Sequence, residues 1–209
     1  MDKLHWEILD EKRVKLLPML SSFRENFYLA GGTALALLIG HRDSVDLDFF
    51  SRNSFSSLEL FNKLNEVLKS NNILKVQEEK DTLTVLVKKK IKISFFAYPY
   101  KLVKPLIKSE FINLAAIEDI GLMKLSAITG RTAIKDYVDL YWILQKIPLA
   151  DLVELCEKKY KNLDINLVLK SLVYFDDVIE EPINYKISDQ VSYEKIKSFL
   201  RNEVETFLK

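Results

Sequence analysis

Two neighbouring segments of the chain decide the fold, FYLAGGTALALL at residues 27–38 and SVDLDFF at residues 44–50. In the first segment, a short apolar strand runs into the flexible turn Gly31-Gly32, and a helix follows. In the second segment apolar and polar residues alternate, which predicts a strand with Asp46 and Asp48 on one face. The order strand, glycine turn, helix, strand predicts a fold that mixes α and β structure.

The rest of the chain divides into a mixed half and a helical half. An amphipathic helix interrupted near Pro18 comes first, and Ser56 opens a later helix with a capping box. The predicted further strands are residues 73–77, 82–87 and 91–98, and the predicted helices are residues 117–129, 133–145, 149–159, 165–174 and 193–207. We therefore predict an α+β fold, with a mixed sheet and flanking helices over residues 1–112 and an all-helical part over residues 113–209 packed against it.

The composition is that of a folded chain with balanced charge. Its 209 residues are 48% hydrophobic and include 31 Lys and Arg against 30 Asp and Glu. This excludes a disordered chain, and also a uniformly basic nucleic-acid binder. The chain has no apolar run of ~18 residues and no signal-peptide core, so we expect a cytoplasmic location with no membrane partner. The single cysteine, Cys156, is expected to be a buried thiol on an apolar helix face.

The glycine pair and the two carboxylates suit the same chemistry. Gly31 and Gly32 let backbone N–H groups approach a triphosphate at a helix N-terminus. Asp46 and Asp48 stand about 6–7 Å apart along one strand face and can ligate a hard divalent cation. Either pattern alone is common in turns and on strand surfaces. In this order, the two patterns together predict metal-assisted phosphoryl transfer.

These residues also carry a resemblance to a known family. GGTAL at residues 31–35 and HRDSVDLDFF at residues 41–50 resemble the nucleotidyltransferase superfamily of DNA polymerase beta and kanamycin nucleotidyltransferase, and more closely its AbiEii/AbiGii toxin branch. Similar blocks of that branch are KLSAITGR at residues 124–131, KDYVDL at residues 135–140 and SLVYFDD at residues 171–177. The likeness covers most of residues 27–177 and keeps the order of the motifs.

The resemblance implies an enzyme that transfers a nucleotide from an NTP to an acceptor with Mg²⁺ as cofactor. The implied acceptor is an RNA, expected to be tRNA, and the implied setting is a toxin-antitoxin or phage-defence system with a cognate antitoxin. The motifs assign catalytic roles to Asp46, Asp48, Lys124 and Asp136, with Asp46 and Asp48 as the metal ligands. They assign nucleotide contacts to Gly31, Gly32, Thr33, Arg42, Ser44, Arg131 and Lys135. Ser44 matches a serine that is phosphorylated in neutralised relatives, or is simply a polar strand residue near the metal site.

The helical block raises choices that the sequence leaves open. Lys124 and Arg131 share a helix face at i and i+7 unless Gly130 ends the helix first. Lys135 and Asp139 are spaced as an i, i+4 ion pair. We favour Asp136 over Asp139 as the functional acid, acting either as the base on the acceptor hydroxyl or by orienting Lys124 or Lys135.

One position departs from the superfamily pattern. A third carboxylate is usual on a later strand, and the matching strand here has Ser94, with Lys92 beside it. This departure leaves open a degenerate member that binds an NTP or a partner without turnover. A separate alternative is a small-molecule enzyme resembling those that modify aminoglycosides.

A lysine-rich stretch and the two histidines complete the candidates. Residues 82–109 carry seven lysines and no acid, interleaved with aromatic residues, which fits either an RNA-binding edge or a solubilising turn at Lys88-Lys89-Lys90. His5 and His41 lie in different motifs, which argues against a histidine zinc site or a Ser-His-Asp triad. For His41, contact with the substrates and a structural role are both open.

Overall fold

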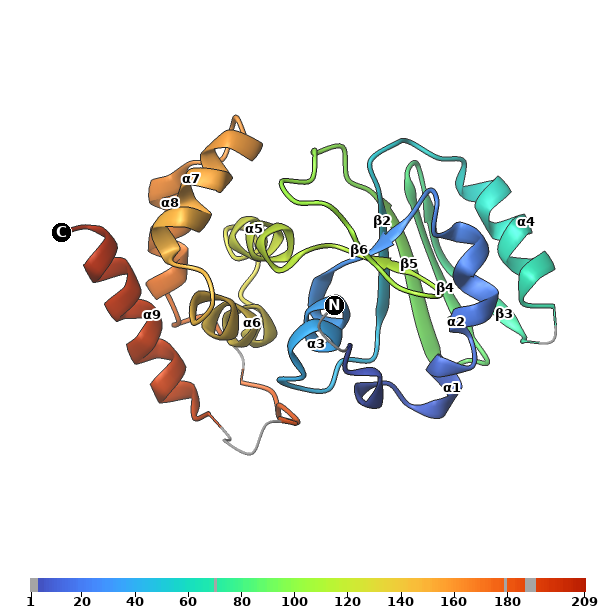
Figure 1. Ribbon diagram of the computed structural model, residues 1–209, viewed down its shortest axis with the longest axis horizontal. Helices are drawn as coiled ribbons and strands as arrows, with labels where there is room; N and C mark the ends of the chain where they lie inside the picture. Colours follow the sequence, from blue (N-terminus) through green and yellow to red (C-terminus); the bar gives the residue numbers. More distant parts are fainter. Residues whose placement is uncertain (1–3, 70, 179, 187–190) are drawn as a thin grey trace.

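The protein, described here by a computed structural model over residues 4–69, 71–178, 180–186 and 191–209, is built on a seven-stranded mixed sheet of order β3-β4-β5-β2-β1-β7-β6 (Figure 1). The strands are β1 (Tyr28–Leu29), β2 (Leu47–Ser51), β3 (Ile73–Glu79), β4 (Thr82–Val87), β5 (Ile91–Ala97), β6 (Ile107–Lys108) and β7 (Asn113–Leu114). The α-helices are α1 (Glu11–Val14), α2 (Leu17–Leu20), α3 (Gly31–Ile39), α4 (Ser57–Val67), α5 (Ile117–Ala127), α6 (Ile134–Leu144), α7 (Leu149–Lys159), α8 (Ile165–Val173) and α9 (Tyr193–Phe207). The predicted α+β class is confirmed.

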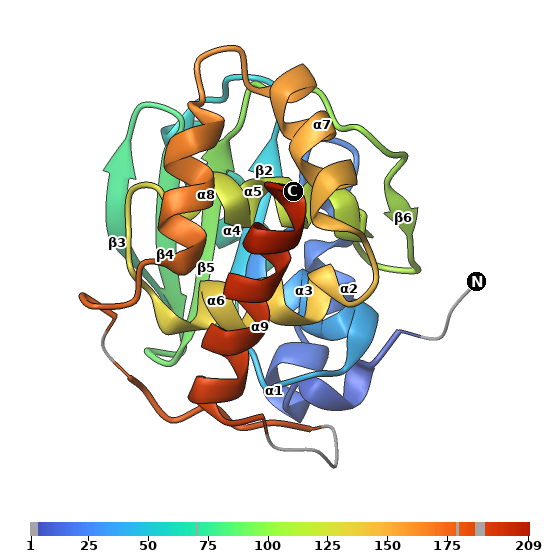
Figure 2. The same cartoon turned by 90° about the vertical axis from the view of Figure 1, so that its left-hand side faces the viewer.

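The sheet separates two layers of helices. Figure 1 shows α2 and α4 over one face and α3, α5 and α6 over the other, with α7, α8 and α9 beyond them. Turning the molecule places α9 in front, flanked by α7 and α8 (Figure 2). In the described part of the chain, no helix combines the length and apolarity needed to cross a bilayer.

Strand β2 carries the two faces of the sheet on alternate residues. Leu47 and Phe49 are buried, and the ring of Phe49 stacks on that of Phe95 of β5, with 5.2 Å between centroids. Phe27 meets Phe95 edge-on at 5.0 Å, so aromatic packing fills the layer on this side. The residues between them along β2, Asp48 among them, face the other way, which confirms the predicted alternation.

The termini of several elements follow the sequence signals. The hydroxyl of Ser56 accepts a hydrogen bond from the N–H of Glu59 at 3.3 Å, as the capping box predicts. The predicted N-terminal helix is instead a series of short turns, formed by η1 (Trp6–Ile8), α1, α2 and η2 (Ser21–Phe23), with Pro18 in the first turn of α2. Cys156 is fully buried, as predicted. The division of the chain at residue 112 stays a prediction.

Candidate active site

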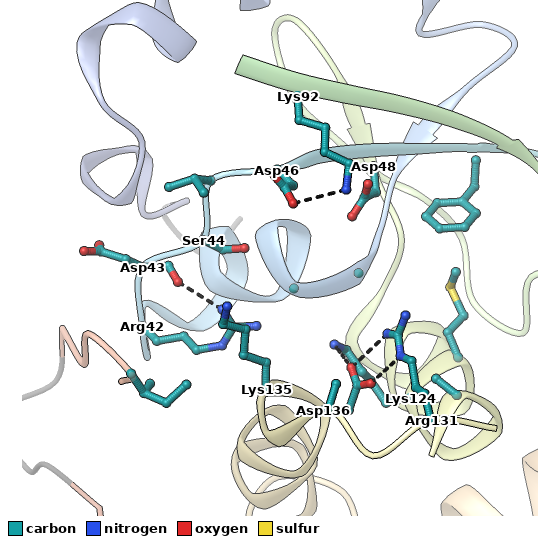
Figure 3. A pocket seen from close by; sticks show the side chains of 18 of the residues that line it. Arg42, Asp43, Ser44, Asp46, Asp48, Lys92, Lys124, Arg131, Lys135 and Asp136 are labelled. Carbon is teal, nitrogen blue, oxygen red and sulfur yellow. Dashed lines mark hydrogen bonds and ion pairs between the residues drawn. The ribbon is translucent and has the colours of Figure 1, made fainter. Parts of the chain in front are cut away.

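A cavity of about 750 Å³ lies between the sheet and the helical layer (Figure 3). Its walls come from the N-terminus of α3, the loop before β2, the strands β2 and β5, the helices α5 and α6, and residues 182–184. It brings together the sequence-predicted residues Gly31, Gly32, Arg42, Ser44, Asp46, Asp48, Lys124, Arg131, Lys135 and Asp136. The cavity therefore brings together residues from Gly31 to Asn184, which lie far apart in the sequence.

The glycine turn opens the start of α3 to the cavity. Helix α3 begins at Gly31, and the first N–H groups of a helix have no partner within the helix itself. Gly31 has φ of +71°, which favours glycine. A Cβ atom on Gly32 would lie only 2.5 Å from Nη2 of Arg42, so glycine makes room for this guanidinium. The result is an uncovered helix N-terminus beside a cation, which suits a phosphate.

Thr33 and Ser44 hold the loop that carries Asp46 and leads into β2. The buried Thr33 hydroxyl donates to the backbone carbonyl of Asp46, and the Oγ atoms of Thr33 and Ser44 are 2.7 Å apart. Ser44 lines the cavity, whereas Thr33 is buried behind it and braces the loop. The strand also starts later than predicted, at Leu47 instead of Ser44, because side-chain contacts replace sheet pairing in this loop.

Asp46 and Asp48 both line the cavity and repel one another. Burial and the negative charge of Asp46 raise the pKa of Asp48, and the charge of Lys92 only partly offsets this. Lys92 Nζ is 3.5 Å from Asp46 Oδ2, but both side chains are about half exposed, so the pair contributes little stability. Asp48 therefore lies in a locally negative field that Lys92 does not cancel.

This donor set fits a hard divalent cation. Two partly buried carboxylates on one face supply the oxygen ligands that Mg²⁺ prefers, while phosphate oxygens complete its shell in many enzymes. Across the described residues, no third Asp, Glu, His or Cys gathers with them in a metal-binding group. The position opposite Asp48 on β5 is Ser94, which is buried and 3.4 Å from Thr84 Oγ1. Protein ligands are thus present for one cation, and a second would depend on the substrate.

Lys124 and Arg131 meet on Asp136, although they do not share a helix. Helix α5 ends at Ala127, and the chain turns so that Arg131 Nε lies 2.7 Å from Asp136 Oδ2. Lys124 Nζ lies 2.6 Å from Asp136 Oδ1. The hydrogen bonds that Arg131 donates to the Asp136 carboxylate raise the pKa of Arg131. Asp136 thus holds two cations at the cavity wall.

Asp139 lies one helical turn further on and is fully buried. It receives hydrogen bonds from Arg42 and His41, and Lys124 Nζ is 2.6 Å from its Oδ2. Burial alone would raise the pKa of Asp139, but the charges of Lys124 and Arg42 hold it well below its usual value. The expected Lys135–Asp139 pair is not formed, because Asp139 points inward; Lys135 Nζ is instead 3.1 Å from Glu181.

His41 has a structural position. Its ring is fully buried with Nε2 2.8 Å from Asp139 Oδ1, and burial lowers its pKa despite that carboxylate. In the described structure it lies outside the cavity lining. Of the two roles left open for His41, the geometry supports the structural one.

Two parts of the wall lie outside the predicted site residues, although Phe96 and Tyr98 belong to the lysine-rich stretch whose aromatic residues fit an RNA-binding edge. One is an aromatic end formed by Phe50, Phe96, Tyr98 and Met123, and the other is the segment 182–184. The alternation of β2 and β5 could have revealed the first, because Phe50 and Phe96 follow Asp48 and Ser94 by two residues. Nothing local marks the second, which is placed by backbone hydrogen bonds: Asp43 N–H donates to Asn184 at 2.9 Å, and an isolated antiparallel bridge joins Arg42 to Tyr185.

The lysine-rich stretch is split by the structure. Lys88 to Lys90 form the exposed turn between β4 and β5, while Lys92 reaches the cavity. Of the aromatic residues, Phe95 is in the core and Tyr100 is 40% exposed.

Comparisons with known proteins agree with this geometry. The family model described as "Nucleotidyl transferase AbiEii toxin, Type IV TA system" matches residues 16–208. An uncharacterized protein of Aquifex aeolicus (strain VF5) is 36% identical over 189 residues, 88% of each chain. Among solved structures, JHP933 from Helicobacter pylori has a TM-score of 0.59 at 19% identity, over 95% of this chain and 92% of that one. The nucleotidyltransferase toxin MenT4 from Mycobacterium tuberculosis H37Rv has a TM-score of 0.57 at 14% identity, over 94% and 82% of the two chains.

Proposed function

Since the chain belongs to the AbiEii nucleotidyltransferase toxin family of toxin-antitoxin systems, we propose that it transfers a nucleotide from an NTP to the end of an RNA. The acceptor that we propose is tRNA, in the cytoplasm, with Mg²⁺ as cofactor and a cognate antitoxin as antagonist. The observation that carries the proposal is the position of the open N-terminus of α3 directly beside Asp48. A Cβ atom placed on Gly31 would lie 3.7 Å from Asp48 Oδ2. A phosphate-binding element and a metal-binding element thus share one cavity.

The polar wall binds and orients the triphosphate in this proposal. The N–H groups at the start of α3 donate to phosphate oxygens, and Arg42 and Lys135 line the same region with positive charge. Asp46 and Asp48 would hold the divalent cation, whose positive charge would offset phosphate charge and favour ionisation of the attacking hydroxyl. Lys124 and Arg131 stabilise the charge that develops on the transferred phosphate.

Asp136 acts as a positioning residue in this mechanism. Both of its oxygens already accept hydrogen bonds from Lys124 or Arg131, so its carboxylate is committed to holding these cations. This supports orientation of the cations over abstraction of a proton from the acceptor. Asp139 supports the same arrangement from behind, because it contacts both Lys124 and Arg42.

The charge of the cavity favours RNA over a cationic drug as the acceptor. Lys92, Arg131 and Lys135 line its open parts, and a polyanion is attracted where an aminoglycoside would be repelled. The second candidate function is NTP binding without transfer. The observation that favours it is Ser94, which leaves the carboxylate pair without a third acid.

A labelling experiment tests the proposal. Purified protein is incubated with each α-³²P-labelled NTP, Mg²⁺ and total RNA, beside the variant with Asp46→Asn and Asp48→Asn. Asp151→Asn, an exposed acid on α7, is the matched control. Label in tRNA with wild type and control, but not with the double variant, supports the proposal. NTP binding by wild type with no label in any RNA supports the second candidate.

A further inference from the structure

The face of the sheet inside the cavity changes from acidic to aromatic along two parallel strands. Asp46 directly precedes β2, and Asp48 and Phe50 follow it at two-residue intervals on the strand, where they line up with Ser94 and Phe96 of β5. At ~3.3 Å per residue, each pair is about 6–7 Å from the next. The cavity therefore has a carboxylate centre with an aromatic end directly beyond it.

The aromatic end consists of Phe50, Phe96, Tyr98 and Met123, all partly exposed in the cavity wall. The rings of Phe50 and Phe96 are 5.4 Å apart between centroids, and that of Tyr98 is 5.9 Å from Phe50. Tyr28 stacks on Phe50 at 6.2 Å, and this fixes the ring from the side of β1. These contacts preform an apolar surface, and Met123 adds a side chain that adapts to what it contacts.

The opposite end of the cavity is polar. Gly32 adjoins Arg42 and Ser44, and Figure 3 shows Arg42, Ser44 and Lys135 gathered on one side of Asp46 and Asp48. The leaving pyrophosphate belongs to this polar end, because the open helix N-terminus, Arg42 and Lys135 are there. In an in-line displacement the attacking oxygen approaches the phosphorus from the side opposite the leaving group. The acceptor therefore enters from the aromatic end.

We propose that the aromatic end binds the terminal nucleobase of the acceptor RNA and so places its ribose hydroxyl at the carboxylate centre. This rests on the proposed function. A base offers a flat, polarisable face that packs on exposed phenylalanine rings with little regard to sequence. A sugar-based drug has no such face, and a cationic one would also meet Arg131 and Lys92. In this arrangement the base stacks on Phe96 and Phe50, and the cations near the carboxylates contact the adjoining phosphate.

Fluorescence without turnover tests the site directly. A short RNA with 2-aminopurine as its last nucleotide is titrated with protein in the absence of NTP and Mg²⁺, beside an RNA with 2-aminopurine at an internal position. We expect quenching of the terminal probe by wild type and a loss of this quenching in Phe96→Ala. Phe96→Leu keeps an apolar side chain without a ring and guards against misfolding of the alanine variant. Phe61→Ala, a partly exposed phenylalanine on α4, is the matched control and should quench like wild type.

Kinetics distinguish the acceptor base from the base of the NTP. Loss of stacking on Phe96 should raise KM for RNA about ten-fold or more and leave KM for the NTP unchanged. A raised KM for the NTP alone overturns the proposal, as does terminal quenching that is the same in Phe96→Ala, Phe96→Leu and wild type. If wild type transfers no label to RNA, the proposed function fails, while the quenching experiment still decides whether the aromatic end binds a terminal base.

Discussion

The guanidinium of Arg42 grips the carboxylate of Asp139 with two parallel contacts, Nε to Oδ1 at 2.7 Å and Nη2 to Oδ2 at 2.8 Å. Both side chains are buried. Arg42 lies in the loop that leads to Asp46 and Asp48, and Asp139 lies in α6. This ion pair therefore fixes α6 to the loop that carries Asp46.

Asp139→Asn should strongly destabilise the protein, by about 3–5 kcal/mol, because it leaves Arg42 and Lys124 buried without their shared partner. Urea unfolding at pH 7 measures this, with Asp151→Asn as the control. The folded pKa of Asp139 is well below its unfolded value, so the stabilisation is complete above about pH 4 and is lost only as the pH falls further. A difference between wild type and variant that disappears between pH 7 and pH 5 would contradict this assignment.

Asp48→Asn should stabilise the metal-free protein, by about 0.5–2 kcal/mol, while abolishing transfer. Its raised folded pKa means that the fold disfavours the charged form, so the penalty is present at neutral pH and disappears as the pH falls through that pKa. Thermal unfolding in EDTA measures the effect at pH 7. Mg²⁺ should then raise the Tm of wild type but not of the variant; equal shifts in both proteins would place the cation elsewhere.

Gly32→Ala should weaken NTP binding about ten-fold or more, since the new methyl group would occupy the space of the Arg42 guanidinium. Gly130→Ala is a matched control, because its Cβ would find its nearest neighbouring atom 4.0 Å away. Equilibrium binding of a labelled NTP gives the comparison. Equal affinity in the two variants would mean that Arg42 does not act at the phosphate end.

Changing Lys88 to Asn together with Lys89 to Gly should raise stability by about 1 kcal/mol. These residues form the centre of a tight turn, closed by a 3.1 Å hydrogen bond from Lys90 to Val87, and have φ of +52° and +57°. The same change removes two positive charges, so it tests RNA binding by the turn at Lys88 to Lys90 in a protein whose fold is not destabilised. If the turn binds RNA, the slope of log affinity against log salt concentration falls by about 2; an unchanged slope assigns the lysines to solubility.

The features of the fold that depend on local residue spacing could be predicted from the sequence. Alternation placed Asp46 and Asp48 on one face, and helical periodicity located α5 to α9 within a few residues of their ends. Strands β6 and β7 were not predicted, because a strand of two residues is too short to show an alternating pattern. Each is a strand only because it pairs with a neighbouring strand.

Long-range packing decided the rest of the site. Lys124 and Arg131 both contact Asp136 because the chain turns after α5. Lys135 pairs with Glu181 because the chain returns to this place after α8. Neither contact has a periodic signature. The motif offered Asp136 and Asp139 as candidate functional acids, but their different surroundings follow only from the folded arrangement.

The return of residues 182–186 to the loop before β2 has a consequence for synthesis of the protein. Asn184 and Lys186 pair with Asp43 and His41, and this segment forms one wall of the cavity. The ribosome makes it after the glycine turn, the carboxylates and the cations of α5 and α6. A chain that ends before residue 182 therefore contains the glycine turn, the carboxylates and the cations of α5 and α6, but it lacks one wall of the cavity.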